Sequence, residues 1–437
     1  MLILKNVNSI NFYPPIINED IDVVIDKNII SEVGKNISAK YKADRIIDLS
    51  GKYISPGLVC SHNHFYSALA RGIIAEMKPA NNFLEILQNL WWKLDKAIDQ
   101  EILNYSGIVS SLEAIKAGTT SVIDHNSSPN FIKGSLNTLK RCFEEAGLRG
   151  ILCYEVTDRN GSNKILESLK ESADFISTIE KESANNPERL IEAAIGAHAQ
   201  FTLSDKTLSL ISEIVNQTGK GIHIHICEDK SDAEYATINF GITAAERLAR
   251  FNLLNEKSIL AHGVHLSKKD IQLINEHDSF LVHNPRSNMN NGVGYLKYPG
   301  QITNTAMGTD GIGSNMLEEI KFAFFKNKES KNKITGEIFL KFLQNGNQIL
   351  ERYFNQKLGR IAPGYMADIV VYDYLPPTPL VNENLSGHLT FGLSSHDVET
   401  VIINGKIVYE NRQFPFDTSS IYSDARNAAK KLWARIK

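Results

Sequence analysis

The chain has 437 residues, which is longer than most compact domains and predicts either one large barrel or several domains. With 42% hydrophobic and 22% charged residues, its composition is typical of a folded globular protein and excludes wholesale disorder. The formal net charge is only −3, which gives no electrostatic reason to expect binding to nucleic acid or to an anionic membrane. We therefore expect a small-molecule ligand.

The cysteines and the apolar segments bear on the cellular compartment. None of the four cysteines belongs to a C-x-x-C pair of the kind found in zinc ribbons and thioredoxin-like redox sites. The apolar run in residues 1–7 is too short for a signal peptide, and no stretch has the length of a membrane span. We therefore expect a cytoplasmic protein without membrane contact, and we expect it to form a homo-oligomer, most simply a dimer.

Residues 1–55 alternate apolar and polar positions in short runs, which predicts antiparallel β-structure. From residue 56 onward, short apolar strands alternate with amphipathic stretches such as 101–117 and 203–217, as in β/α units around a parallel sheet. Eight such strands match a (β/α)₈ barrel. The predicted strands are 57–60, 121–124, 150–156, 191–197, 221–226, 258–261, 279–282 and 305–308.

Short strands return near the C-terminus, at 368–372 and 400–403, and Asn404-Gly405 is a typical hairpin turn. The predicted fold class is α/β, a (β/α)₈ TIM barrel with a small β-sandwich built from both chain ends. We expect residues 1–55 to form the first part of the sandwich and residues 56–359 to form the barrel. Residues 360–437 would add the second part of the sandwich and a C-terminal helix.

Histidines follow the predicted barrel strands at or just beyond their carboxyl ends. The active site of a (β/α)₈ barrel lies at this face, so side chains far apart in the sequence converge there. A single histidine in such a place is more often an ordinary buried or surface residue, but the repetition favours a common site. These residues are His62, His64, His125, His198, His223, His225, His262 and His283, and Asp310 follows the eighth strand in the same way.

Two pairs of histidines have the two-residue spacing of a strand. His62 and His64 end the first barrel strand, and because side chains alternate, both point to the same side. His223 and His225 repeat the pattern on the fifth strand, with Glu228 three residues later. Imidazole nitrogen suits zinc and other divalent first-row ions, so the pairs predict a metal site; a solvent-exposed polar strand end is the alternative. The spacing leaves open which histidine of the second pair binds.

Asp310 stands in Gly308-Thr309-Asp310-Gly311, where glycines allow a tight turn and a close approach of the backbone. A turn aspartate is the plainer interpretation of this tetrapeptide. Together with His62, His64 and one histidine of the fifth strand, Asp310 would complete three nitrogens and one oxygen around a metal that keeps a position for water. His262 is expected beside that water as orienter, base or additional ligand.

Other common catalytic motifs are missing from the sequence. It contains no H-E-x-x-H helix, no phosphate-binding loop and no Rossmann glycine run. The paired H-x-E and P-C-x-x-C motifs of cytidine-deaminase zinc sites are absent as well. The barrel-mouth histidines therefore carry the functional prediction.

Eight short motifs are shared with a known family. They are Ile54-Ser-Pro-Gly-Leu-Val59 before His62-x-His64, Gly118-Thr-Thr-Ser121, Gly196-Ala-His198, His225-x-x-Glu228, Ala261-His-Gly-Val-His265, His283-Asn-Pro-x-Ser287-Asn288, Gly308-Thr-Asp-Gly311 and Gly359-Arg-Ile-Ala-Pro-Gly364. Together they resemble the amidohydrolase superfamily over nearly the whole chain. Within it, the sequence resembles the ATZ/TRZ-like branch of guanine, 8-oxoguanine and S-adenosylhomocysteine deaminases and triazine hydrolases, and most of all the aminohydrolases called SsnA.

The resemblance implies a ligand set and catalytic roles. His62, His64, His225 and Asp310 would bind the metal, with Asp310 also accepting a proton from the attacking water. Glu228 would shuttle protons to the substrate, and His262 would be the partner of the water. Binuclear members use a carboxylated lysine at the end of the fourth strand, and residues 193–198 contain none. The resemblance therefore implies one divalent ion, Zn²⁺ first and Fe²⁺ second.

The implied reaction is the hydrolytic deamination of an amino-substituted nitrogen heterocycle, purine-like or related, by metal-activated water with release of ammonia. The alternative is hydrolysis of another C–N or C–Cl bond at the same site, in a triazine or a cyclic amide. Trp91 could stack on the ring, although its helical spacing with leucines favours a core position. Besides Trp91, the resemblance implies that His198 contacts the substrate. Five further candidate substrate contacts are equally open to a structural hydrogen bond: Gln200, His125, Glu155, Asn284 and Arg286.

Overall fold

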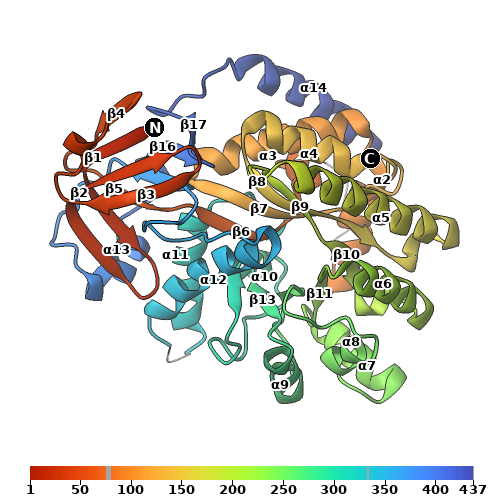
Figure 1. Ribbon diagram of the computed structural model, residues 1–437. Helices are drawn as coiled ribbons and strands as arrows, with labels where there is room; N and C mark the ends of the chain where they lie inside the picture. The colour runs from red at the N-terminus through yellow and green to blue at the C-terminus, as the bar shows by residue number, and fades with distance from the viewer. Residues whose placement is uncertain (75–79, 332–333, 437) are drawn as a thin grey trace.

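Eight parallel strands form the centre of the larger part of the molecule and follow one another in sequence order around a barrel (Figure 1). This strand order confirms the expected TIM-barrel architecture. The computed structural model describes residues 1–74, 80–331 and 334–436. The barrel strands are β6 (Leu58–Asn63), β7 (Thr119–Asn126), β8 (Arg149–Val156), β10 (Ile195–Ala199), β11 (Ile222–Ile226), β12 (Ile259–His262), β13 (Phe280–His283) and β14 (Thr305–Met307).

The barrel closes where the chain leaves β14 and meets β6. The backbone amides of Thr309 and Asp310 both donate to the carbonyl oxygen of His62 at 3.0 Å. The predicted strand 191–197 is interrupted: β9 (Ile191–Ala193) pairs with β8 alone, and the chain then continues as β10. The break falls at Ala194, whose amide donates to the carbonyl of Leu152.

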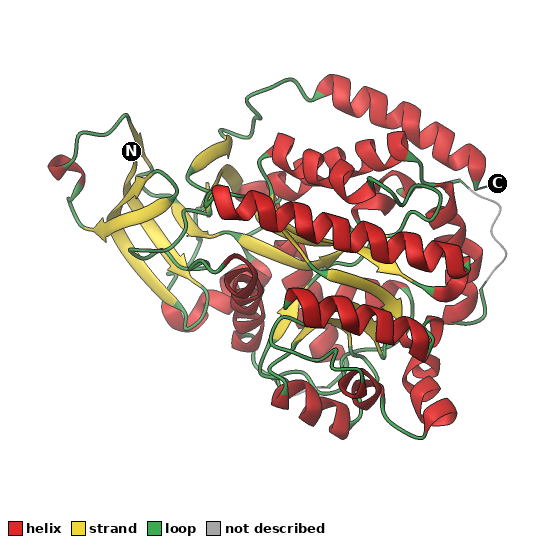
Figure 2. Ribbon diagram, turned by 45° about the vertical axis from the view of Figure 1, so that its right-hand side comes forward, coloured by secondary structure: helices red, strands yellow, loops and turns green. Residues whose placement is uncertain are grey.

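Helices cover the outside of the barrel, as Figure 2 shows. They are α3 (Gln100–Lys116), α4 (Ser135–Ala146), α5 (Ser162–Asn185), α6 (Asp205–Thr218), α7 (Lys230–Phe240), α8 (Ala244–Arg250), α9 (Lys268–Glu276), α11 (Met316–Glu329) and α12 (Glu337–Phe354). The short α10 (Pro285–Asn290) lies instead at the carboxyl end of β13, at the mouth of the barrel. α6 illustrates how the sequence sets these helices. The Ser204 side chain caps its first turn by accepting from the amide of Thr207, and Gly219 ends it in the left-handed conformation.

The small domain is a single mixed sheet contributed by both chain ends, in the order β17-β16-β15-β5-β1-β2-β3 with β4 beside β1. Its two halves pair antiparallel along β5 and β15, and an isolated bridge between Ile29 and Met366 joins them a second time. The sheet has an aliphatic core of its own. Its strands are β1 (Leu2–Asn11), β2 (Ile16–Asp26), β3 (Ile29–Gly34), β4 (Arg45–Asp48), β5 (Tyr53–Pro56), β15 (Ile369–Tyr372), β16 (Val398–Ile403) and β17 (Lys406–Tyr409). The sheet of this domain lies at one side of the barrel (Figure 2).

The C-terminal helix α14 (Ser419–Arg435) returns from the small domain and lies along the barrel near α3 (Figure 1). Trp433 anchors it by donating from Nε1 to the carbonyl of Leu69 at 2.8 Å. α13 (Leu385–Phe391) packs against α11 on the other side. Throughout the described ranges, no helix has both the length and the apolar character needed to cross a bilayer.

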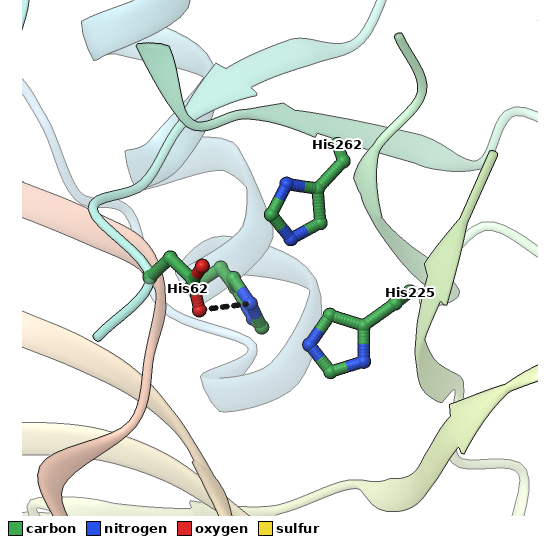
Figure 3. Close-up of side chains that lie close together, drawn as sticks. His62, His225 and His262 are labelled. Atoms are coloured by element: carbon green, nitrogen blue, oxygen red, sulfur yellow. Dashed lines mark ion pairs between the residues drawn. The ribbon is translucent and has the colours of Figure 1, made fainter. Parts of the chain in front are cut away.

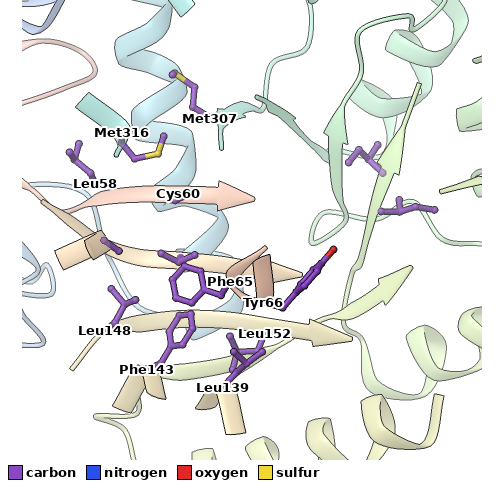
Figure 4. Close-up of a cluster of buried hydrophobic side chains, with 14 of the residues drawn as sticks. Leu58, Cys60, Phe65, Tyr66, Leu139, Phe143, Leu148, Leu152, Met307 and Met316 are labelled. Carbon is purple, nitrogen blue, oxygen red and sulfur yellow. The ribbon is translucent and has the colours of Figure 1, made fainter. Parts of the chain in front are cut away.

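The segment after β6 covers the mouth of the barrel. It contains the 3₁₀-helix η2 (Phe65–Ala70), α1 (Phe83–Ile86), a π-helical turn η3 (Leu87–Trp91) and α2 (Trp92–Ala97). Phe65 fixes its start by stacking on Phe143 at a centroid distance of 4.9 Å, within the apolar cluster of Figure 4. π-Turns are rare and occur frequently at functional sites.

Candidate active site

Three imidazoles and a carboxylate from four different strand ends meet at the mouth of the barrel. Single ligand atoms of His62, His225, His262 and Asp310 all lie within 4.8 Å of one another, and Figure 3 shows the three rings grouped around one point. His64 joins them, with Nε2 3.2 Å from Nε2 of His225 and 3.0 Å from Oδ1 of Asp310. Asp310 Oδ1 also lies 3.6 Å from Nε2 of His62. The cluster has the donors of a first-row metal site.

The hydrogen bonds behind the rings determine which nitrogen of each faces the cluster. Nδ1 of His64 contacts the carbonyl of His125 at 2.7 Å, and Nδ1 of His225 contacts the carbonyl of His198 at 2.6 Å. A carbonyl only accepts, so both Nδ1 atoms carry a proton. Nε2 of His225 then offers a lone pair, and Nε2 of His64 offers one once its own proton is released. The Nε2 atom of His62 is buried without a hydrogen-bond partner. Lone pairs aimed at one another in this way fit a shared cation.

His223 lies behind the cluster and supports it. Its Nε2 is 2.8 Å from Nδ1 of His62, while its own Nδ1 faces the thiol sulfur of Cys153 at 3.6 Å. If Nδ1 of His62 donates to His223, Nε2 of His62 is left free to bind an ion. The geometry therefore separates the two histidines of β11: His225 faces the cluster and His223 lies beneath it.

The electrostatics of the cluster favour a positive charge at its centre. Burial lowers the pKa of His62 to about 3, so this ring is neutral. For His64, burial acts in the same direction, but the hydrogen bond and the charge of Asp310 outweigh it and raise the pKa to about 9. The same two imidazoles overcome the effect of burial on Asp310 and hold its pKa well below the ordinary value.

Glu228 lies beside the cluster. Its Oε2 is 3.6 Å from Nε2 of His262, and Asn291 donates to its Oε1 at 3.2 Å. Burial raises the pKa of Glu228, and the charge of Asp310 adds to the shift, so this carboxyl keeps its proton to higher pH than an exposed glutamate. Nδ1 of His262 is 2.8 Å from Oδ1 of Asn288. This arrangement suits proton transfer rather than further metal binding.

The backbone is strained where the site is assembled. Asp310 and His262 both adopt left-handed conformations, with φ of 53° and 76°. Ser287 donates to Oδ2 of Asp310, which leaves Oδ1 directed at the cluster. A methyl group on Gly308 would lie 2.8 Å from the backbone nitrogen of His62, and one on Gly311 would lie 3.0 Å from the Trp91 ring. Only glycine fits these two positions without displacement.

A small pocket of about 50 Å³ opens beside the cluster. Trp91 lies at its boundary with a larger cavity of about 940 Å³, because this ring and His64 line both. Trp91 is thus at the pocket and also packs against the apolar core. The other lining residues are Tyr66, Phe83, Leu87, Trp92, Asp95, Glu155, Arg159, His198, Ala199, Phe201, His225, Glu228, Asp232, Asn291 and Asp310.

Four of the candidate substrate contacts lie outside this pocket. Gln200 is fully buried and donates to the carbonyl of Ala244. His125 lies beneath the cluster, with Nε2 3.1 Å from two backbone carbonyls. Asn284 is also fully buried, and Arg286 pairs with glutamates of α11 and lines the larger cavity. His198, Glu155 and Trp91 are the candidates that the fold does bring to the pocket.

Several pocket residues gave no signal in the sequence. Arg159, on the loop after β8, contacts both Glu155 and Asp95, and its guanidinium lies 4.9 Å from the centre of the Trp92 ring. Asp232 comes from the first turn of α7. Charged residues in loops and at helix ends are usually solvated, so neither residue stood out in the sequence. The one available signal was the spacing of Asp232, which lies four residues after Glu228.

The sequence model of the Amidohydrolase family matches residues 53–408. The chain belongs to this family. A 5-methylthioadenosine/S-adenosylhomocysteine deaminase of Thermococcus sibiricus is 32% identical over 398 residues, covering 89% of either chain. A 5'-deoxyadenosine deaminase of Methanococcus aeolicus is 31% identical over 428 residues, covering 94% of this chain and 95% of the relative. These similarities establish a hydrolase that acts on carbon–nitrogen bonds.

Solved structures agree with the family assignment at the level of the fold. An adenosine deaminase from Xanthomonas campestris, solved with bound zinc, superposes with a TM-score of 0.85 at 22% identity, covering 99% of this amidohydrolase and 98% of that chain. The expected superfamily and its deaminase branch are confirmed, while the particular similarity to SsnA aminohydrolases stays a prediction.

Proposed function

We propose that the protein is a mononuclear metal-dependent aminohydrolase that deaminates an amino-substituted nitrogen heterocycle, purine-like or related, and releases ammonia. The observation that carries this proposal is the meeting of His62, His64, His225 and Asp310 beside Glu228, a buried carboxyl whose pKa is raised. The deaminase relatives support the same reaction type. Zn²⁺ is the first choice of ion and Fe²⁺ the second, since imidazole and carboxylate suit both.

One ion accounts for the donors in the cluster. The end of β10 supplies no lysine that could bridge a second ion. A divalent ion held by the four ligands would lower the pKa of a coordinated water to about 7 and so supply a nucleophile at neutral pH. The ligand rings are fixed by the hydrogen bonds at their Nδ1 atoms, so little reorganisation accompanies binding.

The remaining groups move and hold protons. Asp310 accepts the proton of the attacking water at Oδ1, while Ser287 holds Oδ2. Asn288 keeps Nδ1 of His262 in place, so that Nε2 orients the water from the side of Glu228. Glu228 donates its proton to a ring nitrogen, which makes the adjacent carbon electrophilic. It then takes the hydroxyl proton of the addition product and passes it to the departing amine, and the proton held by Asp310 restores the Glu228 carboxyl. Trp91 and His198 bind the ring, and a cytoplasmic homodimer stays our expectation for the assembly.

The test is a screen of the zinc-loaded protein for ammonia release from purines, pterins, pyrimidines and triazines. We expect at least one amino-substituted ring to lose ammonia, and Asp310→Asn to abolish the reaction. His277→Ala, at an exposed position after α9, is the matched control and should react like the wild type. Release of chloride from a halogenated triazine, or opening of a cyclic amide without ammonia, would favour the alternative hydrolase instead.

A further inference from the structure

Asp232, in the first turn of α7, is a carboxyl residue of the small pocket whose bonding is incomplete. Only 2% of it is exposed, and neither of its side-chain oxygens has a hydrogen-bond partner among the described residues. Every other carboxyl that lines the pocket contacts at least one cationic or hydrogen-bonding side chain; these are Asp95, Glu155, Glu228 and Asp310. Buried polar groups are normally paired, so the unpaired state of Asp232 needs a cause.

The start of α7 does not supply that cause. Asp229 already caps the helix, because its Oδ1 accepts from the amide of Ser231 at 2.9 Å and from the hydroxyl of the same residue. Burial and the charge of Glu228 raise the pKa of Asp232 to about 7, and the amides of Cys227 and Glu228 oppose this shift without reaching hydrogen-bond geometry. The helix therefore gains little from this carboxyl, and the pocket that it lines is where a partner can bind.

Glu228 determines which part of a substrate Asp232 can meet. It lies four residues earlier and lines the same pocket, and after burial its charge has the largest effect on the pKa of Asp232. Oε1 of Glu228 is held by Asn291 and Oε2 faces His262, which fixes the position of the carboxyl. The pocket has a volume of only about 50 Å³, so a ring that offers a nitrogen to Glu228 brings the next position of the same edge within reach of Asp232.

The two oxygens of Asp232 favour one kind of ring substituent. An N–H group donates to a carboxylate, and a hydrogen bond to a charged group is stronger than one between neutral groups. A ring edge that presents only C–H leaves the carboxyl unpaired, and such sites discriminate strongly against ligands that lack the matching polar atom. The apolar lining, which includes Phe83, Leu87 and Phe201, suits the faces of a flat ring and leaves its edge to the polar residues.

We propose that Asp232 is a specificity-determining residue that selects rings with a second amino group on the carbon beyond the ring nitrogen that Glu228 protonates. This selection rests on the proposed function and deepens it by naming the substrate class. The class is a diamino nitrogen heterocycle in which the two amino-bearing carbons flank one ring nitrogen, as C2 and C6 flank N1 in 2,6-diaminopurine. The first amino group is the one that leaves as ammonia, and the second donates to Asp232.

Binding without turnover tests the selection. The protein is zinc-loaded Glu228→Gln, in which deamination is suppressed while the new amide can still donate to a ring nitrogen. The ligands are 6-aminopurine, 2,6-diaminopurine and 2-methyl-6-aminopurine, whose methyl group matches the second amino group in size and cannot donate. Titration calorimetry should show at least about tenfold tighter binding of the diamino ring than of either other ring, the scale of a hydrogen bond to a charged group. Equal affinity for the diamino and methyl rings, or binding of none of the three, would overturn the proposal.

Two substitutions of Asp232 in the same background assign the preference to this side chain. Asp232→Leu, which has no polar atom, should reduce the preference for the diamino ring to below about threefold, and Asp232→Asn should leave an intermediate preference because its amide oxygen still accepts. Asp174→Asn, at an exposed position of α5 paired with Lys170, is the matched control and should keep the full preference. A preference that survives in both Asp232 variants would overturn the proposal.

The stability of the variants separates recognition from a structural role. Asp232→Asn removes a buried carboxyl that has no partner and preserves its shape, so the midpoint of urea unfolding should be no lower than that of the parent. A lower midpoint that accompanies the lost preference would make Asp232 a structural residue and overturn the proposal. Absence of ammonia release from every ring in the turnover screen, with the binding preference intact, would contradict the proposed function alone.

Discussion

The backbone amide of Asp310 donates a 3.0 Å hydrogen bond to the carbonyl oxygen of His62, and this contact lies where the barrel closes. His62 and Asp310, the first and the last proposed ligand in the sequence, are thus joined by a backbone hydrogen bond that does not depend on an ion. Their side chains then approach to 3.6 Å between Nε2 and Oδ1. The contact that closes the barrel thus also brings two proposed ligands together, so substitutions at this closure are expected to affect both stability and metal binding.

The first prediction concerns the number of ions and the ligands that hold them. Elemental analysis of the purified protein should find about one equivalent of zinc or iron per chain, because the donors converge on one point. His62→Ala and Asp310→Ala should each lose both the metal and the activity, since each removes a ligand atom. Two tightly held ions per chain would contradict the single site.

Glu228→Gln separates chemistry from metal binding. The carboxyl of Glu228 faces His262 and hydrogen-bonds Asn291, and it is not required to complete the four ligands. We expect the variant to retain metal and fold but to show kcat lower by at least about 10²-fold, the usual effect of removing a general acid or base. His225→Ala is the comparison and should lose the metal. Loss of the metal from the glutamine variant would show instead that Glu228 is a ligand.

His223→Ala tests the support beneath the cluster. Nε2 of His223 is the partner of Nδ1 of His62, so its removal should leave that ring free to rotate. We expect about 10- to 100-fold weaker metal binding in a chelator competition, the range found when partners of ligand histidines are removed, with full occupancy restored at excess metal. Complete loss of the site even at excess zinc would make His223 a ligand rather than a support.

Metal affinity should depend on pH through His64. The pKa of this imidazole is raised to about 9 in the metal-free protein, so it is protonated at neutral pH and must lose that proton when an ion binds. The apparent affinity should therefore rise about tenfold per pH unit between about 6 and 8 and level off near 9. Titrations with a buffered chelator at several pH values would measure this slope, and an affinity independent of pH would show that His64 is already neutral.

Gly308→Ala should destabilise the protein at the barrel closure. The added methyl group would meet the backbone nitrogen of His62 at 2.8 Å and the side-chain oxygen of Asn284 at 2.6 Å, and backbone yields little. We expect a loss of about 1–3 kcal/mol in the free energy of unfolding by urea, together with weaker metal binding. Gly387→Ala, where no atom lies within 4 Å, is the matched control and should be neutral or slightly stabilising. Equal stability of both variants would show that the closure can adjust.

The sequence by itself determined the order of the elements and the side of the barrel on which the chemistry lies. Buried parallel strands are short apolar runs, so all eight could be located from composition and spacing, and the hairpin at Asn404 from its turn residues. His62 and His64 could be placed on one side because strand side chains alternate. These properties depend on neighbours within a few residues.

Only the tertiary structure decided which polar residues meet in the pocket. His223 and His225 both point into the barrel, because they are two residues apart on one strand. Neighbouring strands are staggered around a barrel, so His223 contacts His62 from beneath while His225 faces His64. Gln200 and Arg286 turn away because buried partners outside the pocket bind them. Arg159 enters the pocket through a contact with Asp95 of α2, 64 residues away in the sequence. Such contacts depend on how strands and loops pack, which no local pattern of residues encodes.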